Sequence, residues 1–127
     1  MFHLRILTLN VRGLADPETR RQLFYLLRRW PVDVCCLQEV HAPSTSADRK
    51  QWMREWGKPA SWNAHTAILF QTHLGSPPKF DVHLDGRVLT TTFRYQGREI
   101  NLANIYVPGN THERIPFLDT LTGGGQN

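Results

Sequence analysis

Residues 32–39 read Val-Asp-Val-Cys-Cys-Leu-Gln-Glu, a short apolar run that stops at two polar side chains. The run is too short for a helix and too continuous for a strand with one face in water. It follows Pro31, a residue that ends a preceding helix. We therefore predict a central strand that is covered on both faces, with Gln38 and Glu39 at its carboxyl end.

The segment before this strand is predicted to contain one strand and one helix. A half-alternating apolar stretch ends at Asn10, and a turn-rich loop follows it. Asp16 and Pro17 open a helix, because Asp suits the N-cap and Pro the first helical position. The expected apolar stripe of this helix is Leu23, Leu26, Leu27 and Trp30, and the expected solvated face carries Arg20, Arg21, Arg28 and Arg29.

The segment after the central strand is predicted to hold a helix, a run of antiparallel strands and a last helix. The first of these helices carries Trp52, Met53 and Trp56 and ends at Gly57. Strands are expected over residues 66–70, 80–84, 87–95 and 99–107, and the last two form a hairpin. Thr111 caps a final helix with Ile115, Phe117, Leu118 and Leu121. This order is typical of an α/β fold with a mixed sheet, whose functional residues gather at strand ends.

Length and composition exclude several classes of protein. The 127 residues allow one domain with a core of its own, and no apolar run approaches the ~20 residues of a membrane span. The start lacks the features of a secretory signal, so an intracellular location, nuclear or cytoplasmic, is expected. Cys35 and Cys36 are adjacent on a strand and point to opposite faces, which favours reduced, buried thiols.

The charge balance favours a polyanionic partner without requiring one. The formal net charge is +4 and the pI is about 9.5. Of the 15 cationic residues 12 are Arg, whose planar fork suits phosphate. A basic face that only keeps the domain soluble explains the same numbers equally well.

Glu39 and Asn10 are the first candidates for chemistry. A carboxylate directly after a buried strand either reaches solvent or is held by donors or a cation, because burying it bare is costly. A solvated strand end is the simpler explanation for a lone Glu. Asn10 ends the neighbouring strand, however, and a hard cation such as Mg²⁺ prefers oxygen ligands. The pair could therefore form half of a metal site.

Three stretches resemble successive motifs of the endonuclease/exonuclease/phosphatase superfamily. They are residues 7–14 (LTLNVRGL), 33–41 (DVCCLQEVH) and 104–108 (NIYVP). Within the superfamily the sequence is most similar to the apurinic-type endonuclease domains of non-LTR, LINE-like retrotransposons. The resemblance covers nearly all of this chain but about the N-terminal half of the family domain. It implies the corresponding half of a four-layer α/β sandwich of the deoxyribonuclease-like fold.

The resemblance also implies a role for individual residues. Glu39 would be a ligand of Mg²⁺ or Mn²⁺, with Asn10 as its orienting neighbour in the metal site. Tyr106 would lie beside the scissile phosphate, although a Tyr in such a strand is more commonly just buried. Arg12 and His41 would contact the nucleic acid, most simply DNA. Neither a membrane partner nor a cofactor other than metal is expected.

Two phrases of the complete family, Gly-Asp-Xaa-Asn and Ser-Asp-His, are absent from this sequence. In the complete family a metal stabilises charge on the phosphate while an Asp–His-assisted water attacks in line. We therefore expect a truncated magnesium-dependent phosphodiesterase domain, similar to a retrotransposon DNA endonuclease, with little or no activity by itself. Residues 1–122 are assigned to this partial domain and 123–127 to a flexible Gly-rich tail.

Other interpretations stay open at this point. One is a non-catalytic nucleic-acid-binding remnant that uses Arg20, Arg21, Arg28, Arg29 and the strand-end loops. A decayed retroelement reading frame and a fragment of another phosphodiesterase or phosphatase of the superfamily are further alternatives. His65 stands where the family usually carries a small Gly-containing segment, so we expect a changed loop there. The histidines His3, His65, His73, His83 and His112 have no metal-ligand spacing and are expected at the surface or in packing.

Overall fold

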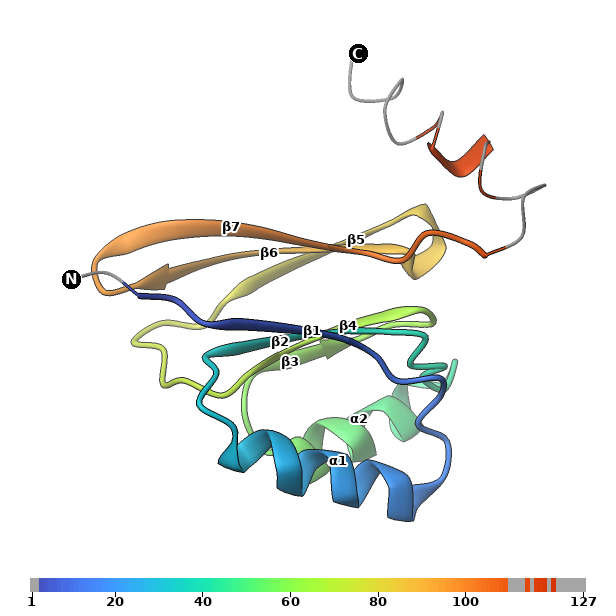
Figure 1. The fold of residues 1–127 in the computed structure, drawn as a ribbon, viewed down its shortest axis with the longest axis horizontal. Helices are drawn as coiled ribbons and strands as arrows, with labels where there is room; N and C mark the ends of the chain where they lie inside the picture. Colours follow the sequence, from blue (N-terminus) through green and yellow to red (C-terminus); the bar gives the residue numbers. More distant parts are fainter. Residues whose placement is uncertain (1–2, 110–113, 115, 119, 121–127) are drawn as a thin grey trace.

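The protein is described by a computed structural model that covers residues 3–109, 114, 116–118 and 120. Two helices, a four-stranded sheet and a three-stranded sheet stack as successive layers (Figure 1). The first sheet has the strand order β1 (Ile6–Asn10), β2 (Val34–Gln38), β4 (Thr66–Phe70) and β3 (Ala60–Trp62). The second contains β5 (Lys79–His83), β6 (Val88–Tyr95) and β7 (Arg98–Ile105). Helices α1 (Pro17–Arg29) and α2 (Ser46–Trp56) cover the outer face of the first sheet.

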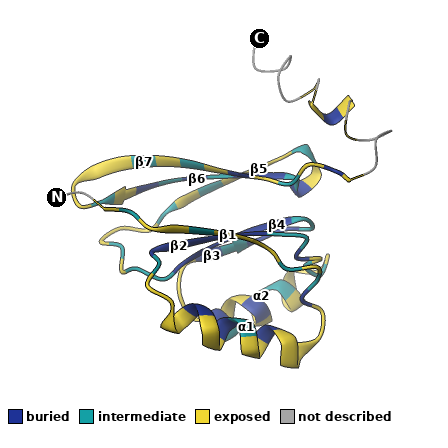
Figure 2. Ribbon diagram, viewed as in Figure 1, coloured by how far each residue is buried: buried dark blue, intermediate teal, exposed yellow. Residues whose placement is uncertain are grey.

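Strand β2 is the central, doubly covered strand that the sequence predicts. It pairs in parallel with β1 and antiparallel with β4, and burial concentrates on β2 and β4 (Figure 2). Cys35 and Leu37 enter the core on the helix side, whereas Val34 and Cys36 enter the core between the sheets. The two thiols point to opposite faces as expected, and both are free and buried.

Helix α1 confirms its predicted start and corrects its predicted stripe. The Asp16 side chain accepts a hydrogen bond from the Thr19 amide, and Pro17 begins the helix. Leu26 and Trp30, predicted to be core residues, are about half exposed. Phe24 is buried in their place, with its ring 5.4 Å from that of Trp56 and 5.8 Å from that of Trp62. The buried stripe is rotated because these aromatic rings fill the space under the helix.

Helix α2 ends as predicted at Gly57, which adopts the left-handed conformation with φ of 80°. Trp52 and Trp56 are buried, whereas Met53 on the same helix is 46% exposed. Its position, one residue after Trp52, turns it away from the sheet. A leucine or methionine at helical spacing therefore does not by itself mark the buried face.

The strands agree with prediction to within two residues. Strand β4 has the predicted bounds, and β6 and β7 form the expected antiparallel hairpin. Strand β7 ends at Ile105, and the Tyr106 amide, which donates to the Arg87 carbonyl oxygen at 2.8 Å, extends the pairing with β6 by one residue. Strand β3 was missed, since three residues are too few for a periodic pattern.

The C-terminal region is described in part. Residues 114, 116–118 and 120 are helical, which agrees with the predicted final helix, and Phe117 is buried. The predicted cap Thr111, the core positions Ile115 and Leu121, His112 and the tail 123–127 lie outside the described residues. Within the described chain, no helix has the length and apolar character needed to cross a membrane.

Candidate functional site

The ends of four strands meet at one edge of the molecule. Asn10 and Gln38 are register partners at the carboxyl ends of the parallel strands β1 and β2. Strand β4 runs the other way, so its first residues lie here too, and the Glu39 amide donates to the His65 carbonyl oxygen at 2.8 Å. The Tyr106 ring, just after β7, stacks on the His65 ring with centroids 5.6 Å apart and planes within 8°.

We call this region the strand-end edge and define it as Asn10, Arg12, Glu39, His41, His65 and Tyr106. The loops after β1 and β2 run side by side, because the Gly13 amide donates to the Glu39 carbonyl oxygen and the Leu14 amide to that of Val40. Gly13 has φ of 90°, and a Cβ there would lie 3.1 Å from the His41 ring. The structure thus brings the predicted site residues to one place.

The backbone at this edge is strained. Arg12, Glu39 and His41 have φ of 53°, 57° and 52°, which is the left-handed region that non-glycine residues rarely adopt. Each such residue costs on the order of 1–3 kcal/mol, and such residues cluster at active sites and ligand clamps. The strain at Glu39 lies at the residue that the sequence singles out as the metal ligand.

Glu39 and Asn10 make few side-chain hydrogen bonds among the described residues. Glu39 is partly exposed, and within the described residues its carboxylate accepts no hydrogen bond. Asn10 is exposed and its side-chain oxygen accepts the Arg12 amide at 3.1 Å, and within the described residues its side-chain nitrogen donates no hydrogen bond to Glu39. A carboxylate of this kind is available to a ligand without breaking an internal contact.

The donor set at the edge suits a hard cation but is small. Glu39 offers carboxylate oxygens and Asn10 an amide oxygen, which are ligand types that Mg²⁺ accepts. Among the described residues, however, no three His, Cys, Asp or Glu side chains are grouped so that they could hold a metal.

Two residues at or behind the edge were missed as site residues in the sequence. His65 immediately precedes a strand that runs antiparallel to β2, so its place opposite Glu39 follows once that pairing is known. Asn104 belongs to a quoted motif and alternates with Ile100 and Leu102, which indicates a buried position. Its partners lie in the other sheet and could not be read from local sequence.

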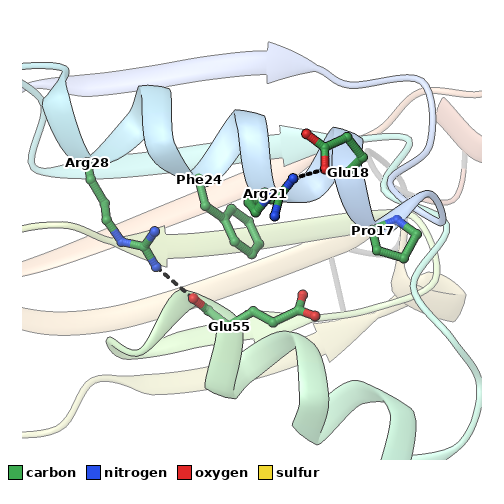
Figure 3. A pocket seen from close by; sticks show the side chains of 6 residues that line it. All are labelled: Pro17, Glu18, Arg21, Phe24, Arg28 and Glu55. Atoms are coloured by element: carbon green, nitrogen blue, oxygen red, sulfur yellow. Dashed lines mark hydrogen bonds and ion pairs between the residues drawn. The ribbon is translucent and has the colours of Figure 1, made fainter.

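A pocket of about 380 Å³ opens elsewhere, on the helix side (Figure 3), and its lining residues are Pro17, Glu18, Arg21, Phe24, Arg28 and Glu55. Its charged groups are already paired. Arg21 pairs with Glu18, and the Arg28 guanidinium donates to the Glu55 carbonyl oxygen at 2.6 Å. The Glu55 carboxylate accepts from Arg20, and this hydrogen bond holds the pKa of Glu55 below its ordinary value.

The same cluster corrects the expected solvated arginine face of α1. Arg20 is 3% exposed, and its guanidinium donates to both Glu55 carboxylate oxygens, at 2.8 and 3.0 Å, and to the Leu14 carbonyl oxygen at 2.9 Å. Arg20 was expected in water because charged residues opposite an apolar stripe usually are. Here the rotated stripe turns it inward, and Glu55 of α2 neutralises it.

Comparison with known proteins agrees with the motifs. The sequence profile of the Endonuclease/Exonuclease/phosphatase family matches residues 7–119, and the chain belongs to this family. The chain is 29% identical over 126 residues to the Transposon TX1 uncharacterized 149 kDa protein of Xenopus laevis, with 94% of this chain and 10% of that protein covered. The predicted resemblance to a LINE-like element is thereby confirmed.

A solved structure supports the fold. An endonuclease/exonuclease/phosphatase family protein from Leptotrichia buccalis C-1013-b superposes with a TM-score of 0.53 at 13% sequence identity. The superposition covers 91% of this chain and 60% of that one. The chain therefore has the fold class predicted from the sequence and spans about three fifths of the length of this solved relative.

Proposed function

We propose that the chain is part of a metal-dependent phosphodiesterase domain that hydrolyses nucleic acid, with DNA as its substrate. The observation that carries this proposal is the convergence of Asn10, Glu39 and Tyr106 at the strained strand-end edge. Family membership and the similarity to a transposon protein support it. The family includes both nucleases and phosphatases, so the nucleic-acid substrate is itself part of the proposal.

In this proposal Glu39 binds Mg²⁺ or Mn²⁺, with Asn10 as its neighbour. The ion, when bound, neutralises negative charge that develops on the phosphate. Tyr106 lies one residue past β7 and is held by the His65 ring, a position from which its hydroxyl can donate to a phosphate oxygen. Arg12 and His41, on the two adjacent loops, contact the phosphodiester backbone.

We also propose that these 127 residues cleave little or nothing by themselves. One carboxylate and one amide are a weak site for Mg²⁺, which usually needs further carboxylates or substrate oxygens. The sequence also lacks the Gly-Asp-Xaa-Asn and Ser-Asp-His motifs. In the complete family these motifs would position and activate the attacking water. In this proposal the chain binds metal and phosphate, but it does not supply the groups that activate the nucleophilic water.

Nicking of supercoiled plasmid in the presence of Mg²⁺ or Mn²⁺ tests the proposed lack of activity. The wild-type chain is expected to nick no faster than its Glu39→Ala variant. Glu99→Ala is the matched control, because Glu99 is an exposed carboxylate on β7 in the far hairpin. Nicking that exceeds Glu39→Ala but survives Glu99→Ala would overturn the proposed inactivity and support the proposed chemistry.

Binding of a short DNA duplex tests the phosphate contacts. Fluorescence anisotropy at low salt should show weaker binding for Arg12→Ala and His41→Ala, with a smaller salt dependence for Arg12→Ala. Lys79→Ala removes an exposed charge from β5 and should have a smaller effect. A loss of affinity confined to Arg21→Ala and Arg29→Ala would instead support the non-catalytic helix-face interpretation.

A further inference from the structure

Asn104 is a buried polar residue inside an apolar layer. It lies on β7, is 3% exposed and faces the first sheet. Its neighbours on the same face of β7, Ile100 and Leu102, pack against the core between the sheets. An amide in such a layer must have its hydrogen-bonding groups satisfied, because leaving them unpaired is costly.

The side-chain amide of Asn104 makes three hydrogen bonds to the opposite sheet. Its nitrogen donates to the carbonyl oxygens of Leu37 at 2.9 Å and Ala67 at 2.8 Å. Its oxygen accepts the side-chain nitrogen of Gln38 at 2.7 Å, and that nitrogen also lies 2.9 Å from the Thr8 hydroxyl. One side chain on β7 is thereby bonded to β2 and β4 together.

These bonds fall at fixed spacing from the strand-end edge. Asn104 is two residues before Tyr106, Leu37 is two before Glu39, and Ala67 is two after His65. Two residues are one pleat of a strand, or roughly 6.6 Å. On each of the strands β7, β2 and β4, the Asn104 hydrogen bonds therefore lie one pleat from the residue that the strand contributes to the edge.

Strand pairing among the described residues stays within each sheet and so does not fix the position of one sheet against the other. The strands pair in the order β1, β2, β4 and β3 in one sheet and β5, β6 and β7 in the other. Apolar contacts such as that between Phe70 and Phe93, with centroids 4.9 Å apart, are non-directional. The directional links across the layer include the Asn104 bonds and a hydrogen bond from the Thr66 hydroxyl to the Gly86 carbonyl oxygen at 2.7 Å.

Both directional links act on the same region. Gly86 precedes Arg87, whose carbonyl oxygen accepts the Tyr106 amide. The Thr66 bond thus supports the backbone of Tyr106 from one side, and the Asn104 bonds hold the preceding strand from the other. Asn suits the position because two donors and one acceptor are all engaged, whereas Asp lacks donors and Leu lacks both kinds of group.

We infer that Asn104 is a positioning residue for the strand-end edge, and that its amide sets Tyr106 and His65 in place relative to Glu39. The catalytic significance of this inference rests on the proposed function. The placement of the Tyr106 and His65 rings, however, can be tested without metal or nucleic acid. A core residue with a structural role alone would affect stability in proportion to the packing lost. A positioning residue also changes the geometry of the aromatic pair in protein that is still folded.

The test follows the ring-proton resonances of His65 by NMR in the metal-free chain. Stacking under Tyr106 shifts these resonances, and a Tyr106→Leu variant supplies their unstacked positions. Asn104→Leu, which keeps the side-chain volume, is expected to move them at least halfway toward the unstacked positions. Ile100→Ala is the matched control, since it removes packing from the same face of β7 without touching the amide, and it should leave them in place.

A His65 spectrum unchanged in folded Asn104→Leu, or moved equally by Ile100→Ala at the same loss of Tm, would overturn the inference. If Asn104→Leu does not fold, Gln38→Leu removes one of the three hydrogen bonds and should move the resonances partway. Unchanged resonances in that variant would also overturn it. Failure of metal to map to Glu39 would refute the proposed function separately, because the ring geometry is measured without metal.

Discussion

Two groups of polar residues in this molecule differ in whether their charged side chains have hydrogen-bond partners within the protein. On the helix side, Arg20 is buried and bonded to Glu55 and to the Leu14 carbonyl oxygen. At the strand-end edge, Glu39 is partly exposed, its backbone is strained, and its carboxylate accepts no hydrogen bond within the described residues. Glu55 also lines the pocket on the helix side, whereas the edge is marked by side chains from separate strands.

The useful distinction between the two groups is whether a charged side chain already has a partner within the protein, and not how many charges or how large a pocket surround it. Charges that neutralise one another at about 2.8 Å have little left to offer a ligand. A carboxylate held on a strained backbone without internal partners costs stability and retains its binding capacity. We therefore propose that the helix-side cluster serves stability and that the strand-end edge serves chemistry.

The largest expected effect is on the helix side. Arg20→Met should lower the free energy of unfolding by about 3 kcal/mol, since it leaves Glu55 and a buried carbonyl group without their donor. The value is at the low end for a buried pair because the Glu55 side chain is 32% exposed. Urea unfolding measures it. Arg21→Met, which breaks an exposed pair, should change stability by less than about 0.5 kcal/mol, and equal losses would contradict the contrast.

A smaller loss is expected at Gly13, which supports the edge. Gly13→Ala should cost about 2 kcal/mol, because φ is 90° and the new methyl group would lie 3.1 Å from the His41 ring. Gly97→Ala is the control, since φ is 77° there with no atom within 4 Å. Its cost should be about 1 kcal/mol of backbone strain alone. If both variants melt at the same temperature, the contact with His41 does not constrain the loop.

Glu39 should show a trade between stability and binding. Glu39→Gly should be more stable than Glu39→Ala by about 1 kcal/mol, because glycine adopts a φ of 57° without strain. Both variants should lose metal binding. At Glu99, on a regular strand, the order should reverse and the glycine variant should be the less stable. The same order at both positions would remove the case for strain at Glu39.

A pH-dependent effect is expected from the thiols on the two faces of β2. Burial raises the pKa of Cys35 to about 12 and that of Cys36 to about 11, from an ordinary value of 9.0. The folded state then keeps protons that the unfolded state releases, so this stability is present below pH 9 and lost as the pH rises toward 11–12. A Cys35→Ala, Cys36→Ala double variant should lose less stability between pH 8.5 and 10 than the wild type. Parallel pH profiles would contradict closed cores on both sides of β2.

Much of the fold could be predicted from the sequence, because its signals are local. The continuous apolar run of β2, the Asp16-Pro17 helix start and the αL glycine after α2 each follow from a few adjacent residues. The rotation of α1 could not be predicted in the same way. Both possible stripes have helical spacing, and the choice was made by Trp56 and Trp62, which are distant in sequence.

In the candidate site, too, local features could be predicted from the sequence and contacts between distant segments could not. Asn10, Glu39 and Tyr106 were identified from motifs, and the parallel pairing of β1 with β2 explains why the first two lie together. The stacking of Tyr106 on His65 and the three bonds of Asn104 depend on how the two sheets face each other. Contacts across a sandwich have no period in the sequence, so the structure was needed to find them.

The assignment of chemistry to the strand-end edge is tested most directly by Mn²⁺ titration of the ¹⁵N-labelled chain, followed by paramagnetic line broadening. We expect the strongest broadening at the amides of residues 10–13, 39–41 and Tyr106. This broadening should be lost in Glu39→Gln and kept in Glu99→Gln. Broadening centred on Glu18 and Glu55 at the helix-side pocket, or undiminished at the edge in Glu39→Gln, would contradict it.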